Sequence, residues 1–221
     1  MASGLTTAGV VTRKRNISAG RGVTAGRGIS KLENNPDGTR SPYEMNVTYM
    51  DALSRRECSD EERCARFILA HAILLSFPGV PAIYIQSILG SRNDYAGVEK
   101  LGYNRAINRK KYSSKEITTE LDNKATLRYS VYYKLSHLIT LRRSHKEFHP
   151  DNNFTIDAIN SFVMRIQRSN ADGDCLTGLF NVSENIQHIN ITDLHGRDLI
   201  SEVDILGNEI TLHPWQVMWI K

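Results

Sequence analysis

Polar side chains gather after a short apolar run in the middle of the chain. The run covers residues 80–85, and the chain breaks at residues 89–91 before a long polar loop. That loop carries guanidinium, carboxylate, amide and phenol groups: Arg92, Asn93, Asp94, Tyr95, Glu99, Tyr103, Asn104, Arg105, Asn108 and Arg109. A buried strand that ends in such a loop is how α/β barrels present binding and catalytic groups. We therefore expect residues 79–109 to carry the chemistry.

The elements before and after this stretch are expected to be helices. Ser59 and the acidic residues 60–62 predict a helix N-terminus with a capping box, and apolar residues continue to residue 75. The helix should stop before Pro78 and Gly79, which connect it to a nearly continuous apolar strand, as in a parallel sheet covered on both faces. A second helix is expected over roughly residues 122–143, where leucines recur at a spacing of three to four.

The pattern of apolar and polar residues changes near residues 146–152. Beyond this point apolar and polar residues alternate, and turn residues fall at 170–173, 195–196 and 207–208. Six or so short strands at this spacing predict an antiparallel β-sandwich. The predicted fold class is therefore α/β plus all-β: the last βα units of a (β/α)8 barrel at residues 34–147, followed by a β-sandwich domain at residues 148–221.

Composition limits the class of protein and the cellular compartment that we expect. The chain has 221 residues, 40% apolar residues and a net charge of +4, which is ordinary for a globular protein. Three cysteines without a CxxC pair fit a reducing cytoplasm. The longest apolar run, residues 67–77, is too short to span a membrane. We expect a cytoplasmic protein with no membrane partner, in which His71 is a core residue.

The first 33 residues look unlike a folded element. Residues 1–32 contain six Lys or Arg residues and no acidic residue, and glycines interrupt any periodicity. We expect residues 1–33 to be disordered. A nucleic-acid arm is an alternative, but the segment lacks interleaved aromatic residues, and we expect no nucleic-acid partner. A shift of one base would allow residues 4–33 to encode a Leu/Glu-rich helix, so we hypothesise that they are translated out of frame.

Two stretches resemble a known enzyme family. NNPDGTRSPYEMNVTYMDALS at residues 34–54 and GVPAIYIQSILGSRNDYAGVEKLGYNRAINRKKY at residues 79–112 resemble the sucrose-phosphorylase branch of glycoside hydrolase family 13. The resemblance implies a (β/α)8 barrel with a C-terminal β-sandwich. It also implies transfer of a glucosyl group from glucosylglycerate or a sucrose-like glucoside to phosphate, giving glucose 1-phosphate with retained configuration. The partners would be the α-glucoside and phosphate or glucose 1-phosphate.

The same resemblance proposes substrate-binding residues. The segment NPDGTRSPYE resembles the family's acceptor loop, with Arg40, Tyr43 and Glu44 as its most capable side chains. The segment YNRAINR resembles the motif that holds the donor glucose, and Arg105 takes the place of its arginine. The family often has Asp where this chain has Ala106, which removes a polar group there. The full set of predicted binding residues is Arg105, Arg40, Tyr43, Glu44, Arg92 and Asn93, and Arg40 and Arg92 could instead be solvated loop charges.

The catalytic acids of such an enzyme are not found in the sequence. Retention needs two carboxyl groups about 5 Å apart. In the family they lie upstream of these motifs, and a third acid follows in a His-Asp-Gly motif that this chain does not contain. We expect a fragment without catalytic residues, without a metal or cofactor, and inactive alone. Its partner could be the missing N-terminal part of the barrel.

A different class of function is also open. Trp215 and Trp219 lie four residues apart on the expected last strand, where alternate residues share a face. They could form a sugar-stacking platform of a non-catalytic carbohydrate-binding or interaction module. The alternative is that both pack between the domains or sheets.

Overall fold

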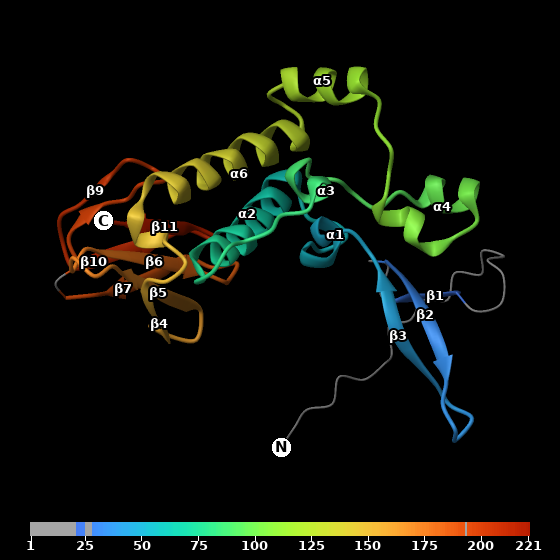
Figure 1. Cartoon of the computed structure of the whole chain (residues 1–221), viewed down its shortest axis with the longest axis horizontal. Helices are drawn as coiled ribbons and strands as arrows, with labels where there is room; N and C mark the ends of the chain where they lie inside the picture. The colour runs from blue at the N-terminus through green and yellow to red at the C-terminus, as the bar shows by residue number, and fades with distance from the viewer. Residues whose placement is uncertain (1–20, 25–27, 193) are drawn as a thin grey trace.

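A computed structural model describes residues 21–24, 28–192 and 194–221. The chain runs from a small N-terminal sheet through a group of helices to antiparallel sheets at the C-terminus (Figure 1). The two ends of this elongated arrangement lie on opposite sides of the helices. The helices therefore connect the predicted binding loops to the C-terminal sheets.

The N-terminal sheet has the antiparallel order β1-β2-β3, with β1 at Arg21–Thr24, β2 at Gly28–Asn34 and β3 at Arg40–Asn46. The turn between β2 and β3 forms where Asp-Gly predicts it, and Gly38 has a φ of 81°. The disorder expected for residues 1–33 differs from the structure at β2. Ile29 is only 2% exposed and packs against Val98, Ala106 and Ile107. Residues 1–20 and 25–27 lie outside the described residues.

Helices occupy the middle of the chain. Their bounds are α1 Tyr49–Leu53, α2 Asp60–Ser76, α3 Ile85–Ile88, α4 Tyr95–Leu101, η1 Asn104–Asn108, α5 Ser114–Asp122, α6 Leu127–Ser144 and η2 Lys146–Phe148. Ser59 caps α2 as predicted, since its hydroxyl accepts from the Glu62 N–H at 3.1 Å. The second long helix begins at Leu127 rather than 122, because Thr126 caps it and α5 is separate. No helix of the described ranges is long and apolar enough to cross a membrane.

The apolar run at residues 80–85 is not the strand that we predicted. Residues 80–84 have no regular secondary structure, and α3 begins at Ile85. Val80 is 86% exposed rather than buried. The reason is physical: a strand persists only beside a neighbour that takes its backbone hydrogen bonds, and within the described residues no strand lies beside this run.

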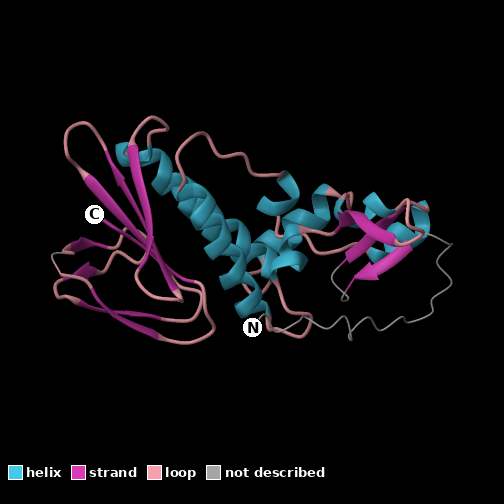
Figure 2. Ribbon diagram, turned by 90° about the horizontal axis from the view of Figure 1, so that it is seen from below, coloured by secondary structure: helices cyan, strands magenta, loops and turns pink. Residues whose placement is uncertain are grey.

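The C-terminal sheets are antiparallel, as predicted. One has the order β11-β6-β5-β4, and two-stranded sheets pair β10 with β7 and β8 with β9. The bounds are β4 Asn153–Ala158, β5 Val163–Ser169, β6 Cys175–Asn181, β7 Gln187–Asn190, β8 Gly196–Arg197, β9 Asp204–Ile205, β10 Glu209–Leu212 and β11 Val217–Ile220. The four-stranded sheet lies beside one end of the two long helices (Figure 2). A second apolar cluster joins it to β7 and β10 through Leu179, Ile189 and Leu212.

One core joins the helices to the four-stranded sheet. It contains Phe67 of α2, Leu135 of α6 and Trp219 of β11, each 0% exposed. The Trp219 indole N–H donates to the Ser76 hydroxyl at 2.9 Å. Trp215 precedes β11 rather than lying on it and packs against the same core, so the structure agrees with the alternative that both tryptophans pack inside the molecule rather than form a platform. Burial of the Trp219 ring removes a large apolar surface from water, which stabilises this core.

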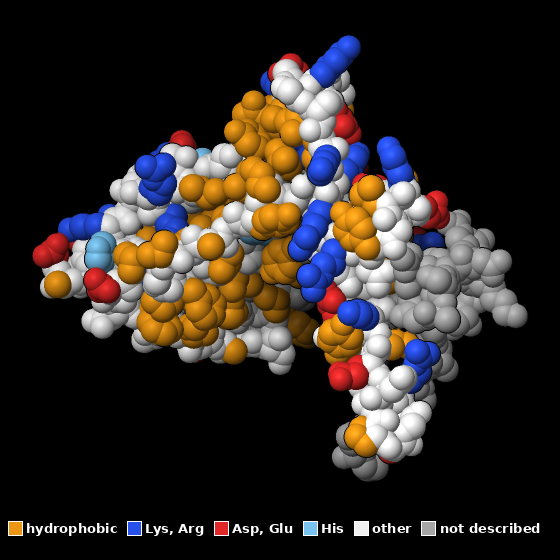
Figure 3. All heavy atoms as spheres, turned by 45° about the vertical axis from the view of Figure 1, so that its right-hand side comes forward, with side chains coloured by type: hydrophobic (Ala, Val, Ile, Leu, Met, Phe, Trp, Pro, Cys, Tyr) orange, Lys and Arg blue, Asp and Glu red, His pale blue; other side chains and the backbone are white. Residues whose placement is uncertain are grey.

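His71 is the core residue that the sequence predicted. It is 2% exposed, and its Nδ1 lies 2.9 Å from the Phe67 carbonyl oxygen, one turn back in α2. Burial lowers the pKa of this imidazole. Not all apolar groups are covered in this way, and Figure 3 shows hydrophobic side chains over much of one face of the helices and C-terminal sheets.

Candidate functional site

The structure brings Glu44 and Arg105 together from two distant parts of the sequence. Glu44 lies on β3 and Arg105 on η1, and the Arg105 Nε–H donates to Glu44 Oε1 at 2.8 Å. This 3₁₀ helix packs against the hairpin through Ala106 and Ile107, which are buried against Ile29. The buried backbone therefore sets the distance between the two charged groups. Ala106 is 2% exposed and offers no polar contact.

Charges around this pair reinforce it. Hydrogen bonding to Arg105 is the main cause that lowers the pKa of Glu44, with smaller contributions from Lys31 and Arg109. The same bond raises the pKa of Arg105. Lys31 lies 5.0 Å from the centre of the Tyr43 ring, and its pKa is raised by hydrogen bonding to that phenol. The carboxylate and the guanidinium thus both stay charged across the neutral pH range.

Arg92 and Asn93 are held by a different carboxylate. The buried Asp51 of α1 accepts from Arg92 Nε at 2.5 Å and from the Asn93 backbone N–H at 2.6 Å. The Asn93 side chain in turn accepts from the Thr48 backbone N–H at 2.7 Å. A carboxylate that accepts from the side chain of one loop residue and from the backbone of the next fixes the loop firmly. The polar loop is therefore pinned to the end of the hairpin rather than free in solvent.

Arg40 is not brought to the other predicted residues. It lies at the first position of β3, beside the turn, and its Nε–H donates to the side chain of Asn34 at 3.1 Å. Four residues of strand separate it from Glu44, which is about 13 Å along the chain at the usual strand rise. The structure therefore groups Tyr43, Glu44 and Arg105, places Arg92 and Asn93 on the neighbouring loop, and leaves Arg40 at the hairpin tip.

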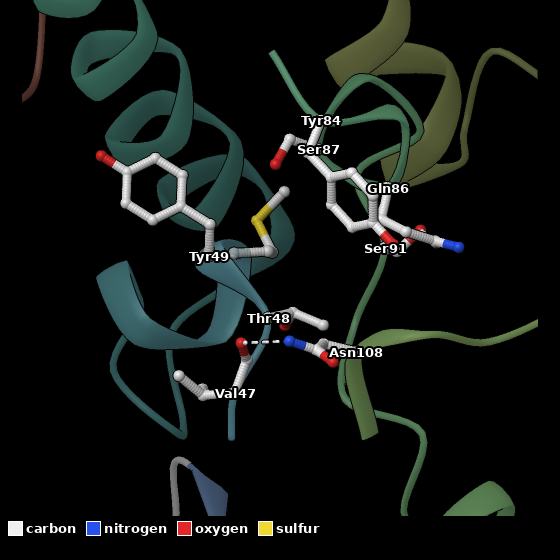
Figure 4. A pocket seen from close by; sticks show the side chains of 9 residues that line it. Val47, Thr48, Tyr49, Tyr84, Gln86, Ser87, Ser91 and Asn108 are labelled. Atoms are coloured by element: carbon white, nitrogen blue, oxygen red, sulfur yellow. Dashed lines mark hydrogen bonds between the residues drawn. The ribbon is translucent and has the colours of Figure 1, made fainter. Parts of the chain in front are cut away.

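A pocket of about 240 Å³ opens between the hairpin end and the polar loop (Figure 4). Its lining residues are mostly neutral: Val47, Thr48, Tyr49, Met50, Tyr84, Gln86, Ser87, Ser91 and Asn108. The Asn108 amide reaches across to the Val47 carbonyl oxygen at 3.5 Å. Two phenol rings with amide and hydroxyl groups suit a neutral, hydroxyl-rich ligand.

Of these lining residues, sequence reasoning included Asn108 in the polar loop and missed Gln86, Ser87 and Ser91. It looked for charged side chains in the loop and passed over the amides and hydroxyls nearest the apolar run. Gln86, Ser87 and Ser91 directly follow that run, which is where barrel enzymes place their sites. Position at the carboxyl end of the run was the signal that could have found them.

A second pocket, of about 270 Å³, lies on the other side of the polar loop and is more charged. Arg92 and Asn93 line it together with Lys110, Tyr112 and Arg128. Each cation there already has a carboxylate: Lys110 binds Glu116 at 2.9 Å and Arg128 binds Glu120 at 2.6 Å. These carboxylates hold the two cations in place beside the pocket.

Two acidic residues beside the binding loops, Glu44 and Asp51, are engaged by arginines. Glu44 binds Arg105, and Asp51 binds Arg92 with Arg63 at 3.8 Å. A carboxylate held this way is a poor nucleophile and a poor acid, because the guanidinium stabilises its charged form. In the part of the chain that the structure describes, no cluster of three or more metal-ligating His, Cys, Asp or Glu residues occurs. The arrangement can bind and orient a ligand.

Comparison with curated proteins connects this arrangement to a group of enzymes. The chain is 88% identical over 189 residues to glucosylglycerate phosphorylase of Escherichia coli, a match that covers 86% of this chain and 34% of the relative. The enzyme of the same name from Allomeiothermus silvanus is 36% identical over 188 residues, covering 84% of this chain and 32% of the relative. Sucrose phosphorylase of Agrobacterium vitis is 34% identical over 122 residues, covering 55% and 22%. The chain spans about a third of the length of the first two relatives.

Solved structures agree at the level of the fold. The maltose complex of AmyP matches with a TM-score of 0.55 at 15% identity, covering 79% of this chain and 37% of that one. A pullulanase from Anoxybacillus, complexed with maltotetraose, matches with a TM-score of 0.58 at 14% identity, covering 79% and 26%. No family model matches the chain. The resemblance is nevertheless confirmed by the curated relatives: this chain is similar to the C-terminal part of sucrose-phosphorylase-like enzymes of glycoside hydrolase family 13, with bacterial glucosylglycerate phosphorylase among them.

Proposed function

We propose that this chain supplies the acceptor loop and the donor-binding arginine of a retaining α-glucoside phosphorylase. The enzyme would transfer glucose from glucosylglycerate or a similar glucoside to phosphate. The observation that carries the proposal is the 88% identity over 189 residues to an enzyme named for that reaction. In this proposal the chain forms the last βα units of a barrel and a C-terminal β-sandwich.

Arg105 is the proposed donor-binding residue. Its Nε is occupied by Glu44, while the terminal nitrogens make no hydrogen bond to any described residue, and 59% of the side chain is exposed. A guanidinium fixed at one nitrogen presents the remaining N–H groups in a set direction. We assign those groups to hydroxyl oxygens of the donor sugar, with Tyr43 and Glu44 holding the arginine in place.

The acceptor side is assigned to the residues around the polar loop. Arg92 and Asn93 are pinned by Asp51 at one edge of the charged pocket. A planar guanidinium matches phosphate or the carboxylate of glycerate. Arg40 at the hairpin tip would reach the acceptor only if the hairpin folds against further protein.

The reaction itself needs groups that this sequence does not provide. Retaining transfer uses one carboxylate as nucleophile and a second carboxyl as acid and base, about 5 Å apart. Glu44 and Asp51 are already bound to guanidinium groups. The chain alone is therefore expected to bind weakly and to release no glucose 1-phosphate.

A single-chain chimaera tests this proposal. The 189 matching residues of this chain replace their counterpart in the E. coli enzyme, and release of glucose 1-phosphate from glucosylglycerate in phosphate is measured. We expect activity close to that of the parent enzyme. Arg105→Ala should lower kcat/KM by about tenfold to a hundredfold, because hydrogen bonds to charged groups contribute roughly 1.5–3 kcal/mol.

A matched control separates the site from general damage. Arg197→Ala removes another exposed arginine, which pairs with Asp204 in the C-terminal sheets, and it should leave kcat/KM unchanged. An inactive chimaera that folds normally, or equal losses for Arg105→Ala and Arg197→Ala, would contradict the proposal. The rival carbohydrate-binding module loses its support, because Trp219 is 0% exposed.

A further inference from the structure

The charged pocket beside the polar loop collects cations from three separate segments of the chain. Its volume is about 270 Å³, and Arg92 of the polar loop, Lys110 of the connection to α5 and Arg128 of α6 all line it. Arg128 also ties its helix to the loop, because Nη1 donates to the Leu89 carbonyl oxygen at 2.6 Å. Like charges around one cavity repel one another, and a bound anion relieves this repulsion.

An aromatic ring of the pocket wall holds two of these cations. The Arg128 guanidinium carbon lies 4.3 Å and Lys110 Nζ 4.6 Å from the centre of the Tyr112 ring. The face of an aromatic ring attracts cations, so it offsets part of the repulsion between them. Arg128 is 7% exposed, and its charge is therefore a fixed part of the wall.

Two carboxylates also line the pocket, and both are engaged by donors of the chain. The Asp94 side chain caps α4, and Glu120 accepts from Arg128 Nε at 2.6 Å. The charges that remain without such a local role in the lining are those of Arg92 and Lys110. The excess charge of the pocket is therefore positive.

Arg92 and Lys110 keep donors for a ligand. Lys110 donates to Glu116 at 2.9 Å, and an ammonium group has three N–H donors. Arg92 contacts Asp51 through Nε, and its terminal nitrogens have no hydrogen-bond partner among the described residues. The two side chains are 38% and 45% exposed. Each cation is thus held at one donor and open at the others, which lowers the entropy cost of binding.

The start of α6 adds donors of a different kind. Thr126 and Leu127 line the pocket, and the Thr126 hydroxyl caps the helix by accepting from the Tyr129 N–H at 3.1 Å. Within the described ranges, the backbone N–H groups of Leu127 and Arg128 have no hydrogen-bond partner. A helix of 18 residues carries a partial positive charge at this end, where phosphate groups bind. The helix start and the side-chain cations therefore favour a ligand of the same charge.

We propose that the charged pocket binds a small phosphate-bearing ligand, with Arg92, Lys110 and the start of α6 contacting the phosphate oxygens. A phosphate group has more acceptor oxygens and more charge than a carboxylate, which suits donors that converge from three segments. The volume admits a phosphate with a few further atoms rather than a long glycan. This site goes beyond the proposed function, which uses only Arg92 and Asn93 at the edge of the pocket, and it does not require the transfer reaction.

Titration of the full chain with inorganic phosphate, followed by amide NMR at constant ionic strength, tests the inference. We expect saturable shifts at the Leu127 and Arg128 amides with a Kd below about 10 mM. Glucose 1-phosphate and acetate are titrated in parallel. Both phosphate compounds should bind, and the tighter of the two shows whether the ligand is a phosphate ester or the free ion. Acetate that binds as tightly as phosphate would overturn the inference.

A pair of matched lysine variants locates the site. Lys110→Gln removes a donor of the pocket, whereas Lys111→Gln makes the same change of charge at an exposed neighbour that does not line it. We expect Lys110→Gln to weaken phosphate binding by roughly tenfold or more and Lys111→Gln by less than about twofold. Glu116→Gln leaves Lys110 in place and removes its carboxylate partner. It should strengthen binding, whereas general damage to the fold would weaken it.

The outcomes separate this inference from the proposed function. Phosphate binding that Lys110→Gln weakens and Lys111→Gln does not supports the site, even if the single-chain chimaera releases no glucose 1-phosphate. Without a saturable shift at Leu127 and Arg128, or with equal weakening by the two lysine variants, the inference is overturned even if the chimaera is active.

Discussion

The half of the chain that contains α2, α6 and the C-terminal sheets differs from the hairpin and polar-loop half in what holds it together. In the first half a continuous apolar core includes Phe67, Leu135 and Trp219, all fully buried. In the second half the core is small, with Ile29, Val98, Ala106 and Ile107, and long-range ion pairs join its segments. Apolar burial gives rigidity without direction, whereas ion pairs orient side chains that must still reach a ligand.

Arginines of the two halves show the same contrast. In the core half, Arg168 donates to the carbonyl oxygens of Ser76 and His149, and Arg142 donates to those of Leu75 and Gly79, at the C-terminal end of α2. These guanidinium groups face the negative end of the helix dipole rather than carboxylates. In the binding half, Arg92 and Arg105 have carboxylate partners.

Removing Trp219 should cause the largest loss of stability. Trp219→Ala empties a fully buried site and leaves the Ser76 hydroxyl without its donor. We expect a loss of about 4 kcal/mol, which lowers Tm by roughly 8–16 °C in a chain of this size. Thermal and urea unfolding measure it. Trp215→Ala should cost much less, since that ring is only partly buried against Arg66, and equal losses would refute the comparison.

Neutralising Asp51 should destabilise the polar loop of the binding half while leaving the apolar core of the other half intact. Asp51→Asn removes the charge that Arg92 Nε and the Asn93 N–H both contact. The expected loss is about 2 kcal/mol, the usual scale for hydrogen bonds to a charged group, with faster hydrogen exchange at Asn93. Urea unfolding and exchange measure the two effects. Asp172→Asn, at a carboxylate that is 74% exposed, serves as the control and should change stability by less than about 0.5 kcal/mol.

Acid should weaken the core half through His71. Burial lowers the pKa of His71 below its ordinary value of 6.5, so the unfolded chain binds a proton that the folded chain does not. Stability is then complete at neutral pH and falls as pH drops below 6.5, by up to about 1.4 kcal/mol per pH unit. His71→Gln should reduce this slope in urea titrations between pH 7 and 5. The exposed His149→Gln should not, and an unchanged slope in His71→Gln would exclude this role.

The ion pair of the binding half should matter for ligands more than for stability. Glu44→Gln leaves Arg105 without its anchor, and in the chimaera we expect kcat/KM to fall several-fold with Tm nearly unchanged. Arg105 lowers the pKa of Glu44 from 4.5, so the pair is complete above that pH and is lost as pH falls through the depressed pKa. Carboxyl NMR titration checks the direction. Asp157→Asn breaks a similar pair with Arg165 in the C-terminal sheet and should not affect kcat/KM.

Local features were predictable from the sequence, because short-range rules produce them. The Ser59 cap, the helix over residues 60–76 and the Asp-Gly turn each depend on residues within one or two turns of the chain. The antiparallel strands followed from alternation and turn spacing. The resemblance to sucrose phosphorylases followed from two long motifs. None of these predictions required knowledge of which distant segments meet.

What only the tertiary structure decided is which segments become neighbours. Glu44 and Arg105 are 61 residues apart, and Trp219 meets Ser76 across 143 residues. No periodicity in the sequence encodes such contacts, which arise when the buried faces of distant segments pack together. Residues 80–85 also show where prediction from the sequence alone fails. Their apolar pattern predicted a buried strand, but a strand forms only where another backbone accepts its hydrogen bonds.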